Sequence, residues 1–511
     1  MARLSSFSII LLLFTSCLPW PDKYSDLAAI VPEPPKREMR AVWLSRFEYC
    51  RYTSTHDQDS IRAYIADVIR NAAAANFNVL FFQIRGNGDA YYTPGLEPWG
   101  ELLTGKAGQD PGWDPLQFAL DSARAYGLEL HAWLNTFPVW RGPKPPPDSI
   151  APFPPYLRHQ DWLVCDSAGV PMPLSDHYVS FSPGIPAVHS YLIELVSDIT
   201  SRYDLDGIHF DYIRYPENAS EAGYSHDSVS VSLFQSKVGN PLELDWADWQ
   251  RNQLTTFVAT MYNAIQVMNN TLKMSVATIG SYHRNGWNAY NAVYQDPRRW
   301  TELGKVDFVV PMIYWPLDHP SYGFSELAEE YRSLGMVERY LIPGIGSYKY
   351  HRDDSEYSWQ EVEREIDFLR SHHFPGLAFF GSKSLTNHWT SLQYGRFRHP
   401  ALIPAMTWKD SLAPAAPVLQ LAVRTLQAVR LAWQSSPSRD VERYAIYLGP
   451  SLPVDSSRAG NILFLTPAAD TAWQIPLAGY KAGYVAVSAL DDAWNESSLS
   501  NPVFIGRSDV P

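Results

Sequence analysis

Cysteine is scarce in this chain, which has only Cys17, Cys50 and Cys165 among its 511 residues. Neither a Cys-x-x-Cys nor a His-Glu-x-x-His spacing occurs, so the sequence contains no recognisable zinc site. We therefore expect no metal and no cofactor. Two interpretations of Cys50 and Cys165 stay open, because they can pair in an oxidising compartment or remain two buried thiols.

Positive charge is also in deficit. Lys and Arg number 41 against 54 Asp and Glu, which gives a net charge of -13 at pH 7. A nucleic-acid partner would need a basic surface, so we expect none. Aromatic residues, in contrast, make up 14% of the chain, with 18 Trp and 30 Tyr. Such rings stack on the apolar faces of sugars, but they also fill large barrel cores, and composition alone leaves both interpretations open.

The N-terminus carries an apolar run at residues 7–14 (FSIILLLF) that has too few residues to span a bilayer. This length is typical of the apolar part of a signal peptide, here residues 1–16. Small residues before Cys17 resemble a bacterial lipoprotein signal, which implies cleavage that leaves Cys17 as the acylated N-terminus. The alternative is ordinary cleavage nearby, with Cys17 discarded. The first interpretation predicts membrane attachment through a lipid anchor, in the cell envelope, as an outer-membrane lipoprotein facing the periplasm or the cell surface.

Residues 17–38 are Pro-rich and polar and are typical of a tether. Between 39 and 410, short apolar runs alternate with longer helical patterns. The predicted strands are 40–45, 78–85, 128–135, 206–211, 273–280, 306–315, 340–346 and 376–381. Helices are predicted at 60–75, 115–126, 187–202, 246–268, 325–334 and 358–371, two of them starting at Asp59-Ser60 and Asp114-Pro115. This α/β pattern predicts a (β/α)8 TIM barrel. A doubly wound sheet is disfavoured, because no Gly-x-Gly-x-x-Gly follows an early strand.

After Pro414 the pattern changes to short alternating strands, at 429–433, 443–447 and 484–488. The stretch 484–498 (YVAVSALDDAWNESS) resembles the end of a fibronectin type III module. Residues 414–507 are therefore predicted to form a small all-β, immunoglobulin-like sandwich that acts as a spacer or a binding module.

Function collects at the C-terminal ends of the strands in such a barrel. Because side chains alternate along a strand, His209 and Asp211 are expected to face the barrel axis, with Asp211 at the mouth. Asp206 and Asp307 begin their strands at the opposite end, where a capping or loop-ordering role is expected. The other side chains expected to face inward are Gln83, Arg85, His131, Trp133, Asn135, Met312 and Tyr314.

Polar groups thus converge at several strand ends, and burying them without partners would be costly, so the pattern indicates a site. His131 taken alone is better explained as a core histidine. The run 206–211 (DGIHFD) also invites comparison with the chitinase motif Asp-Gly-x-Asp-x-Asp-x-Glu. His209 takes the place of the middle Asp and Ile213 that of the catalytic Glu, so a chitinase assignment fails.

Several motifs in a fixed order resemble one family more closely. They are 40–43 (RAVW), 82–85 (FQIR), 88–91 (GDAY), 97–99 (EPW), 103–105 (LTG), 113–116 (WDPL), 131–135 (HAWLN), 206–216 (DGIHFDYIRYP), 294–300 (YQDPRRW) and 311–314 (PMIY). Over residues 38–405 the chain resembles glycosyl-hydrolase-like family 10, a set of bacterial TIM-barrel proteins that includes many lipoproteins. The resemblance implies hydrolysis of cell-envelope glycans. Members linked to cell division act on denuded peptidoglycan strands, which have lost their stem peptides. Many members carry a second Asp where this chain has Tyr212.

Glycoside cleavage needs a proton donor and a second group that stabilises or attacks the anomeric carbon. Asp211 fits the donor if a semi-buried setting raises its pKa. Alternatively, the substrate's own acetamido group replaces the second carboxylate, and Asp211 polarises it. The candidates for a second acid, each more readily explained as a loop residue, are Asp89, Glu97, Asp296 and Asp318. The candidates for sugar binding are Arg85, Trp99, His131, Trp133, Asn135, His209, Arg214, Tyr314 and Trp315, with Trp43 and Trp140 as further platforms.

The sequence therefore predicts a glycoside hydrolase whose partner is a polysaccharide, a cell-envelope glycan that contains amino sugars, with denuded peptidoglycan strands as the first candidate. One alternative is a non-catalytic glycan-binding lipoprotein. The other is a hydrolase of a dietary or matrix polysaccharide.

Overall fold

The computed structural model describes residues 31–51, 56–284, 286–335, 339–351, 358–425, 427–476 and 482–506. The predicted signal peptide and Cys17 lie outside these residues. Within them, the helices are all too short or too polar to cross a membrane.

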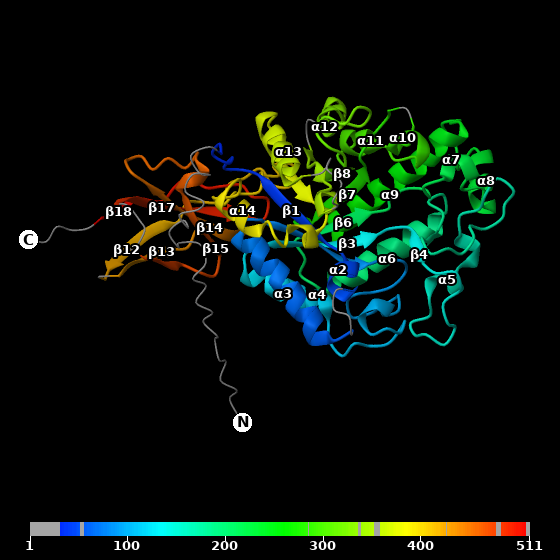
Figure 1. The fold of residues 1–511 in the computed structure, drawn as a ribbon, viewed down its shortest axis with the longest axis horizontal. Helices are drawn as coiled ribbons and strands as arrows, with labels where there is room; N and C mark the ends of the chain where they lie inside the picture. The colour runs from blue at the N-terminus through cyan, green and yellow to red at the C-terminus, as the bar shows by residue number, and fades with distance from the viewer. Residues whose placement is uncertain are drawn as a thin grey trace, which may run out of the picture.

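Eight parallel strands close into a barrel, as predicted (Figure 1). They are β1 (Met39–Leu44), β2 (Val79–Arg85), β3 (Glu129–Asn135), β6 (Gly207–Asp211), β7 (Lys273–Ile279), β8 (Phe308–Ile313), the two-part seventh strand β9 and β10 (Tyr340–Leu341 and Gly344–Ile345), and β11 (Gly376–Phe379). The barrel closes because β11 pairs with β1, while β10 pairs with both β8 and β11. Pro343 has no N–H to donate, and it lies where the seventh strand is interrupted.

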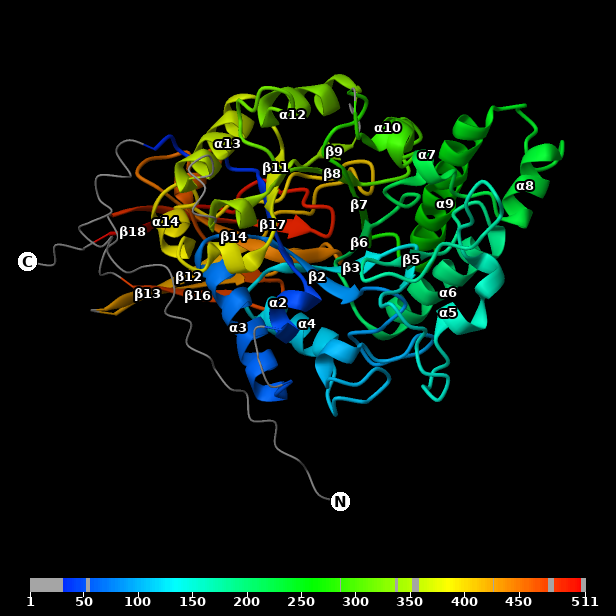
Figure 2. The ribbon, with the colours of Figure 1, turned by 45° about the vertical axis from the view of Figure 1, so that its right-hand side comes forward.

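Helices surround the strands (Figure 2). They are α2 (Arg46–Arg51), α3 (Gln58–Ala74), α4 (Pro115–Ala125), α5 (Pro155–Arg158), α6 (Pro186–Arg202), α7 (Ala219–Ala222), α8 (Ser228–Gln235), α9 (Trp246–Met268), α10 (Ala289–Ala292), α11 (Pro297–Glu302), α12 (Phe324–Ser333), α13 (Trp359–Ser371) and α14 (Trp389–Tyr394). Short 3-10 turns occupy Glu101–Leu103, Gln160–Trp162, Ser347–His351, Ser382–Leu385 and Ala459–Asn461, and the strands β4 (Pro138–Trp140) and β5 (Val179–Ser180) pair with each other. The six predicted helices are confirmed as α3, α4, α6, α9, α12 and α13.

The two predicted helix starts have different outcomes. Asp114 caps α4, because its side chain accepts from Gln117 N at 3.0 Å and Pro115 follows in the first turn. The predicted cap at Asp59 is wrong. Asp57 caps α3 instead, accepting from Ser60 N at 2.9 Å. Asp59 lies in the first turn of that helix, where a carboxylate is favoured by the positive end of the helix dipole.

A β-sandwich follows the barrel. One sheet contains β12 (Val418–Arg424), β13 (Ala428–Gln434) and β16 (Ala472–Pro476), and the other contains β14 (Val441–Gly449), β15 (Ile462–Pro467), β17 (Gly483–Asp491) and β18 (Val503–Ile505). Both sheets contribute to one apolar core that includes Leu431, Trp433, Ile446 and Val487. The predicted strands are confirmed as β13, β14 and β17, whereas the fibronectin likeness stays a prediction.

The sandwich is docked on the floor of the barrel, at the end where the strands begin (Figures 1 and 2). A single cluster of buried apolar side chains runs from the barrel axis, at Trp43 and Phe81, to Ala445 and Leu490 of the sandwich. The outer face of the second sheet therefore seals the barrel. The predicted floor residue Asp307 contacts this junction. It accepts a hydrogen bond at 2.8 Å from Nε1 of Trp408, a residue of the segment that joins barrel and sandwich.

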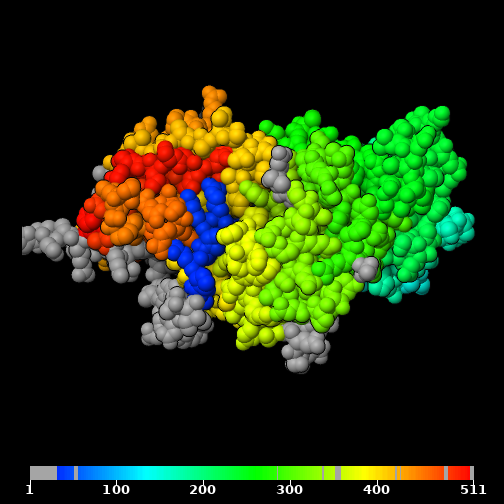
Figure 3. Space-filling view, turned by 90° about the horizontal axis from the view of Figure 1, so that it is seen from above, coloured from blue at the N-terminus to red at the C-terminus, as the bar shows by residue number. Residues whose placement is uncertain are grey.

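The end of the predicted tether is part of this junction, which corrects the expected boundary at residue 38. Figure 3 shows the blue N-terminal segment lying between the sandwich and the barrel. Lys36 pairs with Glu496 of the sandwich at 2.5 Å, and Arg37 donates to the carbonyls of Ile403 and Trp494 at 2.9 Å each. These partners lie hundreds of residues away, so local composition could not reveal them. Cys50 and Cys165 do not form a disulfide with each other, and Cys50 is buried.

Candidate active site

Asp211 ends β6 at the mouth of the barrel, the end opposite the sandwich. Its neighbour in the register is Asn135, the last residue of β3. Gln83 of β2 donates from Nε2 to Asn135 Oδ1 at 3.2 Å and accepts from Arg46 N at 3.1 Å. The top layer of the barrel is therefore a row of polar side chains on three adjacent strands, with the carboxylate at its end.

The predicted alternation holds on β3 and β6. Leu134 and Phe210 belong to the core beneath the helices, whereas Trp133 belongs to the cluster inside the barrel. It fails for Arg85. A β-bulge shifts the register between Gln83 and Arg85, so that Arg85 pairs with outward-facing Leu134. One inserted residue reverses the side to which a strand residue points.

Arg85 is consequently held among the helices. It makes two hydrogen bonds to Glu97, at 2.8 and 2.7 Å, and Tyr191 of α6 donates to the same carboxylate at 2.9 Å. Its Nη1 also donates to the carbonyls of Asn135 and Thr136. Arg85 is fully buried, so its role is to fix the loops after β2 and β3 rather than to face the axis.

Asp211 itself is 6% exposed. Burial raises the pKa of its carboxyl, while the Arg214 guanidinium and the hydrogen bond from Tyr212 N oppose that shift. The hydrogen bond is 2.6 Å long, and Arg214 Nη1 lies 3.5 Å from Oδ1. The carboxyl thus combines a raised pKa with a route to solvent, which is what a proton donor needs.

Tyr212 turns the chain directly after the acid. Its φ is +55°, a left-handed conformation that a residue with a large side chain rarely adopts and that costs about 1–2 kcal/mol. The turn brings Arg214 back under the Tyr212 ring, with Cζ 3.9 Å from the ring centroid. The strain is therefore located where it positions a cation beside Asp211.

Several buried polar atoms at the mouth have no hydrogen-bond partner among the described residues. They are Trp133 Nε1, Tyr314 Oη, Arg214 Nε, and Nε and Nη1 of Arg46. Burial raises the pKa of Tyr314 well above its usual value, and the Asp211 charge adds to the shift, so its hydroxyl stays a donor. The Trp133 indole lies close enough to Asp211 to lower the pKa of that carboxyl, although no hydrogen bond of good geometry joins the two side chains. Free buried donors around one acid indicate a place for a polar ligand.

The two histidines lie deeper in the barrel. His209 stacks on Phe81 with centroids 4.1 Å apart, and its Nε2 accepts from Trp43 Nε1 at 3.0 Å. Nδ1 therefore carries the proton, which it donates to Ser275 Oγ at 2.8 Å. Burial, together with nearby His131, lowers the pKa of His209 well below its usual value. His209 and Trp43 thus have their partners within the barrel interior, whereas Nδ1 of His131 is buried without a hydrogen bond.

His131 bonds at Nε2 to Glu129, at 3.0 Å, near the floor. The predicted floor carboxylate Asp206 has the loop-ordering position expected for it, since its Oδ2 accepts from Leu130 N at 2.8 Å. These contacts separate a structural lower half of the barrel from the polar layer at the mouth.

Each of the four candidate second acids has a structural partner. Asp89 accepts from the backbone of Gly86 and Asn87 at 3.1 and 2.6 Å. Glu97 pairs with Arg85, as described above. Asp296 caps α11 by accepting from Arg299 N at 3.1 Å, and the exposed Asp318 pairs with Arg364. None of these contacts brings the carboxylate to Asp211.

Glu217 is a carboxylate that the strand pattern missed. It lies in the loop after β6, its side chain is 56% exposed, and its Oε1 lies 3.8 Å from Arg214 Nη2. Its charge raises the pKa of Asp211, although burial is the larger cause. One guanidinium therefore lies between the buried acid and an accessible one. The signal in the sequence is the spacing Asp-x-x-Arg-x-x-Glu, with one Arg three residues from each acid.

The remaining predicted platforms are distributed around the mouth. Trp315 is half-buried and stacks on Tyr322 with centroids 5.2 Å apart. Trp140 donates to Lys144 O at 2.7 Å, in the loop after β4. Trp99 is 7% exposed and lines a cavity of about 510 Å³ together with Trp113 and Asp114.

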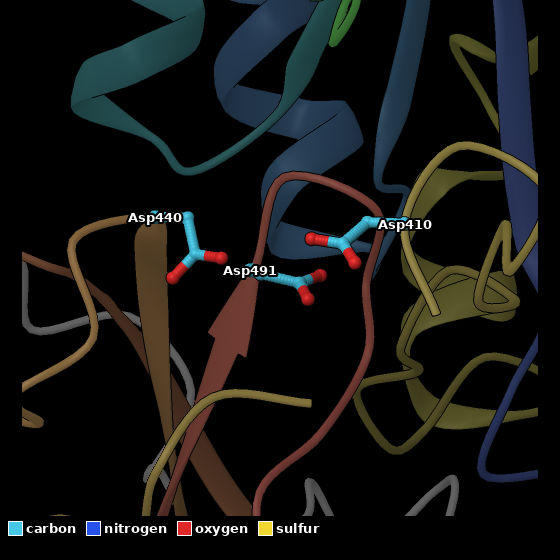
Figure 4. A group of neighbouring side chains, drawn as sticks. All are labelled: Asp410, Asp440 and Asp491. Atoms are coloured by element: carbon cyan, nitrogen blue, oxygen red, sulfur yellow. The ribbon is translucent and has the colours of Figure 1, made fainter. Parts of the chain in front are cut away.

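A cluster of three carboxylates lies elsewhere. Asp410, Asp440 and Asp491 present oxygens within 4.8 Å of one another, where the linker meets the sandwich (Figure 4). Asp491 already accepts from the backbone and the side chain of Asn495, at 2.8 and 2.9 Å. The cluster is at the sandwich end of the molecule, away from the mouth.

The fold and the site define a (β/α)8-barrel protein with a buried acid at the end of its fourth strand. The chain belongs to the family called glycosyl hydrolase-like 10, whose model matches residues 38–337. It is 29% identical over 373 residues to the glycosyl hydrolase DigH of Escherichia coli K12, which covers 66% of this chain and 81% of that protein. It is 24% identical over 443 residues to the glycosyl hydrolase YngK of Bacillus subtilis 168, covering 80% and 82% of the two chains. Among solved structures, it resembles the PgaB (BpsB) glycoside hydrolase domain from Bordetella bronchiseptica, with a TM-score of 0.48 and 12% identity over 71% of this chain and 99% of that one. The predicted family is confirmed.

Proposed function

We propose that this protein is a glycoside hydrolase that cleaves an amino-sugar glycan of the bacterial cell envelope, with denuded peptidoglycan strands as its substrate. The observation that carries the proposal is the setting of Asp211, a carboxyl with a raised pKa among buried donors that have no partner. Membership of a glycosyl hydrolase-like family supports it.

In this proposal Asp211 is the general acid that protonates the leaving glycosidic oxygen. Glu217 is the second carboxylate, since it is accessible to water and shares Arg214 with Asp211. The burial of Asp211 raises its pKa against the opposing charge of Arg214, which suits Asp211 to the donor role, while the exposed Glu217 is open to water. Tyr314 and Trp133 donate to hydroxyl or acetamide oxygens of the sugar.

The same two free donors also favour a second role for Asp211, in which it polarises the acetamido group of the substrate and Glu217 supplies the proton. Glycan strands from which the N-acetyl groups have been removed separate the two roles. A general acid keeps cleaving them, whereas cleavage that depends on the acetamide is lost.

The decisive test is Asp211→Asn, assayed by mass spectrometry of products released from purified denuded strands. We expect a loss of turnover of at least about a hundred-fold, because a proton donor contributes roughly 10²–10⁴-fold. The amide has the size of the acid and carries no charge, so the fold and the melting temperature should be retained. The matched control is Asp204→Asn, an exposed residue whose ion pair with Arg124 contributes little to stability.

Unchanged turnover in Asp211→Asn would overturn the assignment. Saturable binding of strands by the wild-type protein with no reducing ends released would show a glycan-binding protein instead. Cleavage confined to dietary or matrix polysaccharides in a panel of purified glycans would move the substrate outside the cell envelope.

We also propose that Cys17 carries a lipid anchor in the cell envelope, supported by the apolar run and small residues before it. Incorporation of a labelled fatty acid into the wild-type protein, and its loss in Cys17→Ala, is the expected result.

A further inference from the structure

Arg46 differs from the other buried arginines of this protein. Among the residues that the structure describes, four arginines are buried: Arg40, Arg46, Arg85 and Arg214. Arg40, Arg85 and Arg214 each have a carboxylate partner, at 2.7, 2.7 and 3.5 Å. Arg46 has no such partner among these residues, and its Nε and Nη1 are buried without a hydrogen bond. A buried cation without a counter-charge is expensive, so its retention points to a ligand that supplies one.

The guanidinium of Arg46 is held in place by the chain around it. The residue begins α2, directly after β1, and its backbone N–H donates to Gln83 in the polar layer. The guanidinium lies over Gly86, where a Cβ would come within 2.0 Å of Arg46 Cζ. It also faces the ring of Phe47, with Cζ 4.4 Å from the centroid. Any larger residue at position 86 would displace it, so the glycine makes room for this cation.

Arg46 belongs to the same mouth as the acid. Its charge acts on Tyr212, the residue that follows Asp211, and lowers the pKa of that hydroxyl against the larger effect of burial. Arg214 contacts the same Tyr212 ring at 3.9 Å. The charge of Arg214 is already matched by Asp211 and Glu217, whereas no carboxylate among the described residues forms an ion pair with Arg46.

We propose that Arg46 binds a carboxylate carried by a sugar of the glycan, next to the bond that is cleaved. A single unmatched guanidinium matches a monoanion, and its planar fork fits the two oxygens of a carboxylate. This inference rests on the proposed function. It also gives that function a basis for selectivity between glycans with and without peptides. When a peptide is removed from the sugar by hydrolysis of its amide bond, a free carboxylate is left that Arg46 can bind. In a glycan that keeps its peptide, the same group is a neutral amide.

The experiment compares two forms of one purified glycan, the first with free carboxylates and the second with the carboxylates converted to methylamides. The wild-type protein should cleave the free form about 10- to 100-fold faster in kcat/KM, the range of a charged hydrogen bond. Arg46→Gln should lose this preference while it still cleaves the methylamide form. Arg46→Lys should keep part of the preference, because it retains the charge but not the fork. Arg62→Gln is the matched control, since Arg62 lies over Trp113 on the helix side.

Equal cleavage of both forms by the wild-type protein would overturn the inference and leave the proposed function standing. If neither form is cleaved, the proposed function fails, and binding of the two glycans by calorimetry decides the inference alone. It holds if the wild-type protein binds the free form more tightly and Arg46→Gln does not.

The melting temperature is a further readout. Removing an unmatched buried cation should leave it unchanged or raise it, and a large fall with equal loss on both glycans would show a merely structural residue.

Discussion

The pKa of the Asp211 carboxyl is set by two opposing effects, the burial of this residue and the charge of Arg214. Burial favours the protonated form, and Arg214 favours the ionised form. The acid is protonated at low pH and loses its proton as the pH rises through its pKa. Because this pKa is raised in the folded protein, the proton is kept to a higher pH than on an ordinary Asp. Activity that depends on the proton must therefore fall on the alkaline side of the profile.

This balance predicts the effect of Arg214→Gln. Removing the cation leaves burial unopposed, so the pKa of Asp211 should rise further, and the alkaline limb of kcat/KM should move up by about one pH unit. Arg214→Lys keeps the charge and should leave the limb close to that of the wild type. The measurement is kcat/KM on denuded strands across pH. A limb that moves downward in Arg214→Gln, or one that moves equally in both variants, would exclude Asp211 as the titrating group.

Much of the site layer could be anticipated from alternation alone. Asp211, Trp133 and Asn135 lie where a period of two residues places them, because their strands are regular. Trp133 and Tyr314 were predicted to face inward and bind sugar. That their donor atoms lack partners could not be predicted, because it depends on packing across the barrel. Glu217 was missed because it lies in a loop, where no periodicity applies.

At the scale of elements, the eight barrel strands and the six longer helices were predicted to within two residues at each end, because apolar periodicity dictates them. The shorter helices and four of the sandwich strands were not predicted. The exception on β2 has a definite cause: a bulge adds one residue, and the inner and outer faces change places between Gln83 and Arg85. Sequence periodicity has no signal for a bulge at a strand end. The docking of the sandwich on the barrel floor was also beyond prediction, since it depends on contacts between segments far apart in the chain.

The bulge makes Glu97 a structural residue, and this assignment is testable. Glu97→Gln replaces the partner of a fully buried guanidinium and should lower the free energy of unfolding by about 3–5 kcal/mol. The matched control is Glu101→Gln, an exposed residue in the neighbouring turn, which should change it by less than about 0.5 kcal/mol. Denaturant unfolding followed by tryptophan fluorescence provides both values. A Glu97→Gln protein of full stability that has lost only its turnover would make Glu97 a catalytic acid after all.

On the scale of the whole molecule, the sandwich and the candidate active site occupy opposite ends of the barrel. The sandwich lies against the strand starts, and Asp211 is at the strand ends. The described residues of the sandwich therefore add no side chain to the mouth of their own barrel. Its contribution is to close the floor, where the core of the barrel continues into the second sheet.

Trp494 is the residue that best tests this continuity. Its Nε1 donates to Glu129 at 2.6 Å, and Lys273 and His131 contact the same fully buried carboxylate at 2.9 and 3.0 Å. Trp494→Phe keeps an aromatic ring but removes the N–H, which leaves a buried charge one donor short. We expect the free energy of unfolding to fall by about 1–3 kcal/mol.

Because one apolar cluster spans both parts, scanning calorimetry should record a single transition for barrel and sandwich, and Trp494→Phe should move all of it to lower temperature. Trp473→Phe is the matched control: Trp473 lies in the other sheet, stacked on Phe464 with centroids 4.0 Å apart, and a substitution there leaves the floor intact. It should therefore move the transition less. Two separate transitions, with the barrel unaffected by Trp494→Phe, would show a module that is merely attached, and the floor would then be closed by the barrel's own residues.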